Sequence, residues 1–299
     1  MNGVILLDKP AGKTSHDCVF LVRRLLKTKK VGHTGTLDPS VTGVLPICVG
    51  RATKLSQFLT ADEKEYLGEV TIGFSTTTED ADGEMVEQKH VTTDIKESQV
   101  LAVMTQLTGT ITQTPPMYSA VKVNGRRLYD YARAGETVER PTRTIQIREL
   151  ELLSTPVKTD ENTVKFSFRV KGSKGLYVRT LAVMIGEALG YPAHMSHLRR
   201  TQSGIFKIED CLTFEALEEA VKAQNVPMLS VEQALAGMPS VVVNARVEGF
   251  VRNGVKLRDH QITGQPVGPF VVLNEAGQCL AIYEKEDQTD QYKSVRGLL

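Results

Sequence analysis

The sequence predicts a chain of mixed α and β structure in two parts. Amphipathic helices and alternating strands follow one another without a repeated strand–helix–strand unit, which is typical of an α+β fold. After Pro239 the pattern changes to short strands separated by turn signals, which indicates a small separate β-unit. We therefore expect one domain over residues 1–239 and a second over residues 240–299.

The first third of the chain begins with a short buried strand at 4–7. Thr14 and Asp17 have the spacing of a capping box, and the residues after them present an apolar helical face. Residues 66–74 alternate between apolar and polar positions, as strands do. The acidic, polar segment 79–93 predicts a surface loop.

Further signals mark the elements of the middle of the chain. Asp94 and Glu97 predict the capped start of a helix that Gly109 stops. Asn124-Gly125 between two short apolar-and-basic runs predicts a tight turn. Strict alternation over 164–170 predicts a strand.

The remaining elements follow a glycine-rich turn. A helix is expected after that turn, through 181–189, and Gly190 and Pro192 close it. Ser230 with Gln233 predicts another capped helix. The last strands are expected at 241–243, 270–273 and 279–283.

Composition is that of an ordinary globular protein and gives no global charge signal. The net charge is +1, from 36 basic and 35 acidic residues. No run approaches the roughly 18 apolar residues of a membrane-spanning helix, and the N-terminus lacks the basic and apolar regions of a secretory signal. Four widely spaced cysteines favour reduced thiols over disulfides or a cysteine zinc site. We expect a cytoplasmic protein.

Charge is instead segregated along the chain. Basic residues gather at 23–30, 122–143 and 197–207, whereas acidic residues gather elsewhere. Two interpretations remain open: the clusters form one basic face that binds a polyanion, or each is a solvated surface of its own element.

Residues 32–43 stand out because one carboxylate lies among small and hydroxyl side chains. The segment contains three glycines, three threonines, one serine and Asp38, which precedes Pro39. Glycine permits close backbone approach, and proline pushes the residue before it into an extended conformation. The segment therefore predicts a shaped loop that presents Asp38 beside a basic cluster, which suggests chemistry on a polyanion.

The residues alone leave two roles open for Asp38. An Asp before Pro in a loop commonly makes an Asx-turn with its own backbone. Alternatively Asp38 is a nucleophile, which requires a cation that keeps the carboxylate deprotonated and oriented. Arg179, in the first turn of the helix after the turn at 172–175, is the candidate partner.

Other candidate side chains have similar alternatives. Tyr66 starts a strand two residues after Lys64, and is either a core tyrosine or a pocket residue that stacks on a base and takes part in proton transfer. His33 is isolated in the Asp38 loop. His194 and His197 could share a helix face, but no further ligand lies near them, so no metal site is expected.

Gly12-Lys13-Thr14 lies between a strand and a helix, as in a phosphate-binding P-loop. That loop also requires a glycine five residues before Gly12, where this chain has Leu7. A nucleic-acid phosphate contact or a simple helix start is favoured over a nucleoside triphosphatase.

Several blocks, taken in order, resemble the signature segments of bacterial tRNA pseudouridine-55 synthases of the TruB type. These blocks are residues 3–15, 32–43, 115–129, 174–182 and 197–201. The resemblance runs from the N-terminus to about Phe206, and more weakly to the end. It implies a pseudouridine-synthase fold, with a bent, largely antiparallel mixed sheet flanked by helices, followed by a PUA-type RNA-binding β-barrel.

The resemblance also implies a reaction. A uridine at position 55, in the TΨC loop of tRNA, would be flipped out and isomerised to pseudouridine without a metal or nucleotide cofactor. By the same resemblance Asp38 would be the nucleophile, Arg179 its partner, and Tyr66 the residue that stacks on the uracil and helps to move a proton.

The resemblance implies further contacts with the RNA. Lys9 and Leu198 would help to line the pocket, and His33 would lie beside the gap left by the flipped nucleotide. The other residues expected to bind RNA are Lys64, Tyr177, Arg199 and Arg200. We expect a monomer with tRNA as partner and no membrane association. The alternative is a non-catalytic tRNA-binding or folding protein on the same scaffold.

Overall fold

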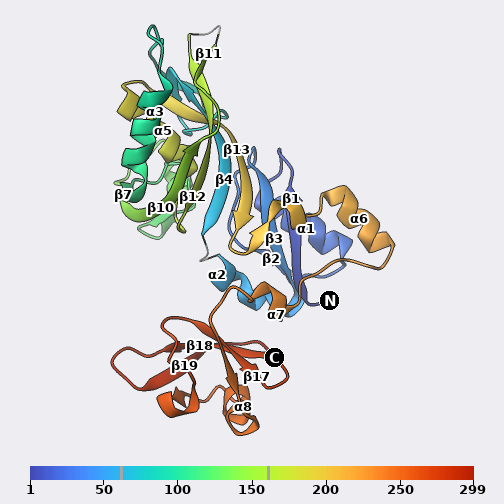
Figure 1. The fold of residues 1–299 in the computed structure, drawn as a ribbon. Helices are drawn as coiled ribbons and strands as arrows, with labels where there is room; N and C mark the ends of the chain where they lie inside the picture. Colours follow the sequence, from blue (N-terminus) through green and yellow to red (C-terminus); the bar gives the residue numbers. More distant parts are fainter. Residues whose placement is uncertain (61–62, 160–161) are drawn as a thin grey trace.

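A ten-stranded mixed sheet organises the larger part of the molecule in the computed structural model, which describes residues 1–60, 63–159 and 162–299 (Figure 1). Its strands are β1 (Gly3–Lys9), β2 (Val31–His33), β3 (Thr42–Val49), β4 (Lys64–Ile72), β7 (Gly109–Gln113), β10 (Arg143–Leu152), β11 (Val157–Lys158), β12 (Val164–Gly172), β13 (Ala193–Ser203) and β14 (Phe206–Lys207). The main path is β1-β3-β13-β4-β12-β10-β7, with β2, β11 and β14 attached beside it. Among the described pairings of this sheet only β13 with β3 is parallel, which confirms the largely antiparallel, mixed sheet.

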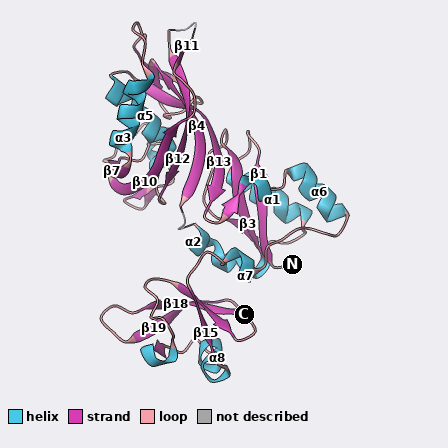
Figure 2. Cartoon of the chain, in the orientation of Figure 1, coloured by secondary structure: helices cyan, strands magenta, loops and turns pink. Residues whose placement is uncertain are grey.

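Helices and short hairpins surround this sheet. The helical segments are α1 (Ser15–Leu25), η1 (Gly50–Leu55), α2 (Ser56–Leu59), α3 (Glu97–Leu107), α4 (Leu128–Arg133), α5 (Val178–Leu189), η2 (Ile208–Asp210), α6 (Phe214–Lys222) and α7 (Val231–Ala234). Two hairpins pair β5 (Phe74–Thr76) with β6 (Met85–Gln88), and β8 (Lys122–Val123) with β9 (Arg126–Arg127). Figure 2 shows α3 and α5 together on one side of the sheet, where they cover its apolar core.

Local signals in the sequence explain how several elements start and turn. Thr14 and Asp17 form the predicted capping box at the start of α1, where the Thr14 hydroxyl accepts from the Asp17 N–H at 3.0 Å. Gly190 ends α5 in the left-handed region, at φ +84°. Residues Asn124 and Gly125 both have positive φ, as the two-residue turn between β8 and β9 requires.

A second, five-stranded sheet follows Pro239. It comprises β15 (Ser240–Val243), β16 (Leu257–Arg258), β17 (Phe270–Asn274), β18 (Cys279–Lys285) and β19 (Gln291–Gly297), in the order β15-β17-β18-β19-β16. The sequence predicted three of these strands but missed α8 (Ala245–Arg252), whose Val247 and Val251 pack into the core of this sheet. A short helical segment, η3 (Asp259–Gln261), follows β16.

Both sheets contribute to one apolar core. It joins side chains of β1, η1 and α2 to side chains of β17, β18 and the C-terminus. The members from the two sides include Val4, Leu6, Leu55 and Phe58, and Val271, Ile282 and Leu298. Lys54 in η1 also donates to the Gly297 carbonyl at 2.8 Å.

Among the described residues, the helices are too short or too polar to cross a bilayer.

Two local predictions are wrong. Residues 79–93 are not a surface loop throughout, because residues 85–88 form β6 and Asp80 is 6% exposed. Asp94 does not cap α3, which starts at Glu97; the Lys96 N–H donates to the Gln99 side chain at 2.9 Å instead.

The two histidines near residue 195 lie in strand β13 and not on a helix. His194 is buried, and its Nδ1 lies 3.1 Å from the Phe74 carbonyl oxygen. His197 is exposed. The helix-face interpretation fails because the stop signal at Gly190 ends the helix before this segment, and the residues after it join the sheet.

Candidate active site

A pocket of about 770 Å³ opens beside the Asp38 loop, a volume in the range of roughly 300–1,000 Å³ that small-ligand pockets have. Its wall draws on segments far apart in the chain. Asp38 comes from the loop between β2 and β3, Tyr66 from β4, Leu198 from β13, and Arg179 from the start of α5. The sheet order explains this meeting, since β3, β13 and β4 are neighbours.

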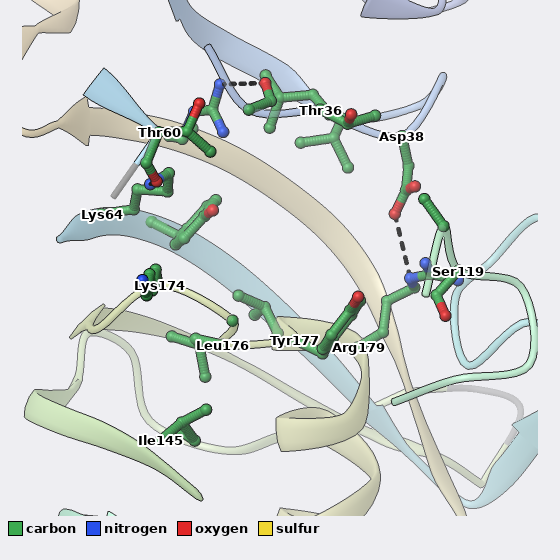
Figure 3. Close-up of a pocket in the computed structure, with 18 of the residues that line it drawn as sticks. Thr36, Asp38, Thr60, Lys64, Ser119, Ile145, Lys174, Leu176, Tyr177 and Arg179 are labelled. Atoms are coloured by element: carbon green, nitrogen blue, oxygen red, sulfur yellow. Dashed lines mark hydrogen bonds and ion pairs between the residues drawn. The ribbon is translucent and has the colours of Figure 1, made fainter. Parts of the chain in front are cut away.

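Asp38 and Arg179 point toward one another at the wall of this pocket (Figure 3). Arg179 Nε lies 3.1 Å from Asp38 Oδ2. The Arg179 side chain is 7% exposed, whereas that of Asp38 is 37% exposed and reaches the pocket. The carboxylate is therefore held by a buried cation and still accessible to a ligand.

The guanidinium of Arg179 has a partner at every nitrogen. Nη1 donates to the Thr78 carbonyl at 2.9 Å and lies 3.6 Å from Asp80 Oδ2, while Nη2 donates to the Tyr118 carbonyl at 2.9 Å. These bonds fix the planar fork and leave Nε directed at Asp38.

Burial raises the pKa of Asp38 even though Arg179 opposes the shift. Asp80 and Asp82 add to the rise through charge repulsion, and Lys9 works against it. The ion pair alone would lower the pKa, so desolvation is the larger effect here. A partly desolvated carboxylate is a stronger nucleophile than a fully hydrated one, provided it stays ionised.

The segment that contains Gly12-Lys13-Thr14 shapes the Asp38 loop. The buried Ser15 hydroxyl accepts from the Leu37 N–H at 2.8 Å and donates to the Leu37 carbonyl at 3.1 Å. The Pro39 carbonyl accepts from the Gly12 N–H at 2.9 Å and from Lys9 Nζ at 3.0 Å. The Gly12 amide, which a P-loop would aim at a phosphate, is thus bonded to Pro39, next to Asp38.

Arg200 holds the other side of this loop. It is 1% exposed, and its guanidinium donates to the Val44 carbonyl at 2.7 Å and the Gly35 carbonyl at 3.3 Å. Gly43 must be glycine here, because a Cβ would lie 2.1 Å from the Arg200 carbonyl oxygen and its φ is +107°. Arg200 lines the pocket, yet these hydrogen bonds are to the protein's own backbone.

Several other predicted residues line the pocket. Tyr66 and Leu198 are each 8% exposed and contribute to its wall. Lys64 lies at its edge. Tyr177 precedes α5 and is anchored by Gln113, whose amide accepts from the Tyr177 N–H at 3.0 Å and donates to its carbonyl at 3.2 Å.

Three predicted residues are not among those that line the pocket. Lys9 has no exposed surface and bonds to backbone carbonyls. His33 lies partly buried in β2, and burial lowers its pKa, so it is neutral at neutral pH. Arg199 is paired with Asp8 at 2.7 Å. Among the residues that the structure describes, no group of three or more His, Cys, Asp or Glu is placed to hold a metal ion.

Sequence reasoning missed the contribution of Asp80. This carboxylate lies 3.6 Å from Arg179 and accepts from the Thr78 hydroxyl at 2.5 Å and the Asp82 N–H at 3.1 Å. The acidic segment 79–93 around it is typical of a solvated surface loop. The signal that could have found it is turn chemistry, since an Asp among threonines with a following Gly83 is typical of a bonded turn.

The three basic clusters differ in their surroundings. In the second and third, Arg126 is paired with Glu136 at 2.8 Å and Arg199 with Asp8. In the first, the lysines at 27, 29 and 30 are exposed, and none of them forms an ion pair with a described residue. The lysines of the cluster at 23–30 are therefore available to a polyanion, as are the exposed cations at 122, 127, 133 and 143 of the second cluster.

Comparison with known proteins agrees with this geometry. Residues 23–178 match the N-terminal domain of the TruB family pseudouridylate synthases, and residues 179–238 match the C-terminal domain of tRNA pseudouridylate synthase B. The chain belongs to the TruB family. It is accordingly an enzyme of the pseudouridine synthase class, and the sheet that begins at Ser240 lies outside both matches.

Curated relatives are similar over nearly their whole length. A protein of Bacillus thuringiensis (strain Al Hakam) named tRNA pseudouridine synthase B is 57% identical over 288 residues, 95% of this chain and 92% of that protein. One of the same name from Geobacillus thermodenitrificans is 53% identical over 287 residues, 95% of each chain.

Solved structures share the fold. A chain of a Cbf5-Nop10-Gar1 complex has a TM-score of 0.76 and 29% identity, covering 99% of this chain and 85% of that one. A chain of an H/ACA RNP bound to a substrate RNA containing 2'-deoxyuridine has a TM-score of 0.73 and 26% identity, with the same coverage. These neighbours confirm the pseudouridine-synthase fold, and the five-stranded C-terminal sheet fits a PUA-like unit.

Proposed function

We propose that this enzyme isomerises a uridine of tRNA, that of the TΨC loop at position 55, to pseudouridine. The observation that carries the proposal is the 3.1 Å contact between Asp38 and the buried Arg179 in an open pocket. The curated relatives, whose name states tRNA as the substrate, support that class of RNA. The preference for position 55 rests on the resemblance of the signature segments.

In the proposed mechanism Asp38 is the nucleophile. A target base inside a folded loop is out of reach, so the nucleotide is flipped into the pocket at a cost of a few kcal/mol. Stacking on Tyr66, which lines the pocket, contributes about 1–3 kcal/mol in return. Asp38 forms a covalent adduct with the nucleotide, at the ribose C1′ or the base C6. The N1–C1′ bond breaks, C1′ bonds to C5, and the bond to Asp38 breaks so that the carboxylate is released. C5 loses its proton and N1 gains one.

The other predicted pocket residues, together with Lys9, have a place in this proposal. Arg179 orients the carboxylate, and Tyr66 is the group placed to help remove the proton. Leu198, Tyr177 and Lys64 surround the flipped nucleotide. Arg200 and Lys9 act on the loop that presents Asp38, through the carbonyl groups to which they donate.

Binding of the rest of the tRNA depends on phosphate contacts and shape. Uridine is common in RNA, so the form of the loop carries the specificity. The exposed lysines of 27–30 are proposed to contact phosphates, and the C-terminal sheet, as a PUA-like domain over residues 240–299, to add a second RNA surface. We propose that the enzyme acts as a monomer in the cytoplasm.

The alternative is a protein that binds and helps to fold tRNA without chemistry. Tritium release from tRNA labelled at uridine C5 decides between them, because the new C5 bond expels that hydrogen. We expect stoichiometric release by the wild type and none by Asp38→Asn, with tRNA affinity retained in both. Asp17→Asn, which changes an exposed carboxylate of the α1 cap, is the matched control and should release tritium normally.

Either of two results would overturn the proposal. Tight tRNA binding by the wild type without release would leave an RNA-binding protein on a synthase fold. Full release by Asp38→Asn would show that Asp38 is not the nucleophile.

A further inference from the structure

The loop between β7 and β10 is tied to the start of α5 and is closed at its own base. At its entry, Gln113 holds the backbone of Tyr177 through two hydrogen bonds. At its exit, Arg140 Nη1 donates to the Pro115 carbonyl at 3.1 Å and so closes the base of the loop. Between these points the Tyr118 carbonyl accepts from the guanidinium of Arg179. Figure 3 shows the neighbouring Ser119 beside Arg179.

The Glu79 side chain lies between this loop and α5. One carboxylate oxygen accepts from the Thr180 hydroxyl at 2.8 Å, and the other lies 3.8 Å from Arg140 Nη1. The side chain is only 20% exposed. Thr180 follows Arg179 in the first turn of α5, and the residues on either side of Glu79 both contact Arg179.

The backbone at Glu79 is unusual for a residue with a side chain. Its φ of +64° lies in the left-handed region, which favours glycine. Backbone bonds hold it there: its N–H donates to Thr76 at 3.2 Å, and its carbonyl accepts from Met195 at 3.0 Å. The conformation would suit glycine, so the contacts of the carboxylate are what a glutamate adds at this position.

We propose that Glu79 is a positioning residue that couples the 114–142 loop to Arg179. By holding Thr180 with one oxygen and Arg140 with the other, it keeps the loop where the Tyr118 carbonyl meets the guanidinium. The loop then fixes the direction in which Arg179 Nε holds Asp38. This inference rests on the proposed function, because it concerns the same Asp38–Arg179 pair.

The charges around Glu79 fit this role. Burial raises its pKa, while the Thr180 hydrogen bond and the cations of Arg179 and Arg140 oppose the rise, and Asp80 adds to it. When the carboxyl is protonated its attraction to Arg140 disappears, whereas an oxygen remains to accept from Thr180.

A double-mutant cycle tests the coupling. Glu79→Gln keeps an acceptor for Thr180 and removes the charge that attracts Arg140; Arg140→Gln removes the other partner. We expect each single variant to lower the single-turnover rate of tritium release by about threefold, the scale of a partly exposed ion pair. The double variant should be no slower than the slower single variant, since both lose one interaction.

Glu79→Gly separates positioning from folding. It removes both side-chain contacts and relieves the left-handed backbone, so the rate should fall by about tenfold or more while the melting temperature does not fall. The matched control is Glu69→Gln. Glu69 accepts from the Ser196 hydroxyl at 2.7 Å, lies 3.8 Å from Lys165 and is not among the residues that line the pocket. The rate of Glu69→Gln should stay within about twofold of the wild type.

Three results would overturn the coupling: a full rate in Glu79→Gly, multiplicative losses in the double variant, or an equal loss in Glu69→Gln. Failure of the proposed function is distinct, because it would appear as no tritium release by the wild type itself.

Discussion

Replacing Arg179 by lysine tests whether geometry or charge makes the Asp38 site work. The substitution keeps a positive charge near Asp38 but removes the planar fork that reaches several partners at once. In the wild type this fork donates to the Thr78 and Tyr118 carbonyls at 2.9 Å each, as well as to Asp38 at 3.1 Å.

The structure sets the expected size of the effect. A lysine ammonium that remains with Asp38 leaves the Thr78 and Tyr118 carbonyls without their donor, and each buried group left unpaired costs about 1–3 kcal/mol. Stability should therefore fall by about 2–6 kcal/mol. Loss of orientation at Asp38 should slow the chemical step by about 100-fold, or about 2.7 kcal/mol.

Single-turnover tritium release measures the rate, a filter-binding titration the tRNA affinity, and thermal unfolding the stability. We expect a slow chemical step with tRNA affinity nearly unchanged, because the Arg179 side chain is only 7% exposed and its guanidinium is bonded to the protein's own groups. If Arg179→Lys reacts within about threefold of the wild type and melts at the same temperature, charge alone suffices and the argument from the fork is wrong.

Two further predictions concern pH and salt. Burial raises the pKa of Asp38, and the carboxylate is the reactive form, so the single-turnover rate should fall as pH drops through a value above the ordinary Asp pKa of about 3.9. The same fall is expected in Glu79→Gln, which lacks the titrating carboxyl of Glu79. A fall of the rate only at or below a pH of about 3.9 would contradict the burial argument. Affinity for tRNA should weaken steeply with salt, and Lys29→Gln with Lys30→Gln should reduce the slope of log K against log salt by about 1 per lysine; a flat wild-type dependence or an unchanged slope would remove these lysines from the RNA contact.

Much of the fold follows from short-range signals. The capping box of Thr14 and Asp17 marks the start of α1, and the alternation over 164–170 matches the buried and half-buried positions of β12. Asp38 and Arg179 could be paired as a hypothesis because each lies beside a glycine-rich turn. That they lie 3.1 Å apart depends on the sheet order, which no local signal contains.

The errors have a common physical cause, which is that tertiary contacts decide the environment of polar residues. Glu79 and Asp80 belong to an acidic run, yet Arg179 and Thr180 draw both toward the interior. Arg200 looked like a phosphate ligand beside its neighbour Arg199. Both residues lie in β13, where adjacent side chains point to opposite faces of the sheet, so that Arg200 is buried while Arg199 is not. The sequence signals did not predict this strand.

The apolar core shared by η1, α2 and the C-terminal sheet determines how the two parts of the molecule can cooperate. Leu55 and Phe58 pack with Ile282 and Leu298, and Lys54 holds the Gly297 carbonyl. The pocket side of the molecule and the C-terminal sheet, the two surfaces proposed to bind RNA, are therefore held at a fixed separation by this packing and not by a flexible linker. A ligand that spans both gains the advantage of bivalent binding with little loss of linker entropy, and one whose dimensions do not match that separation gains only one contact.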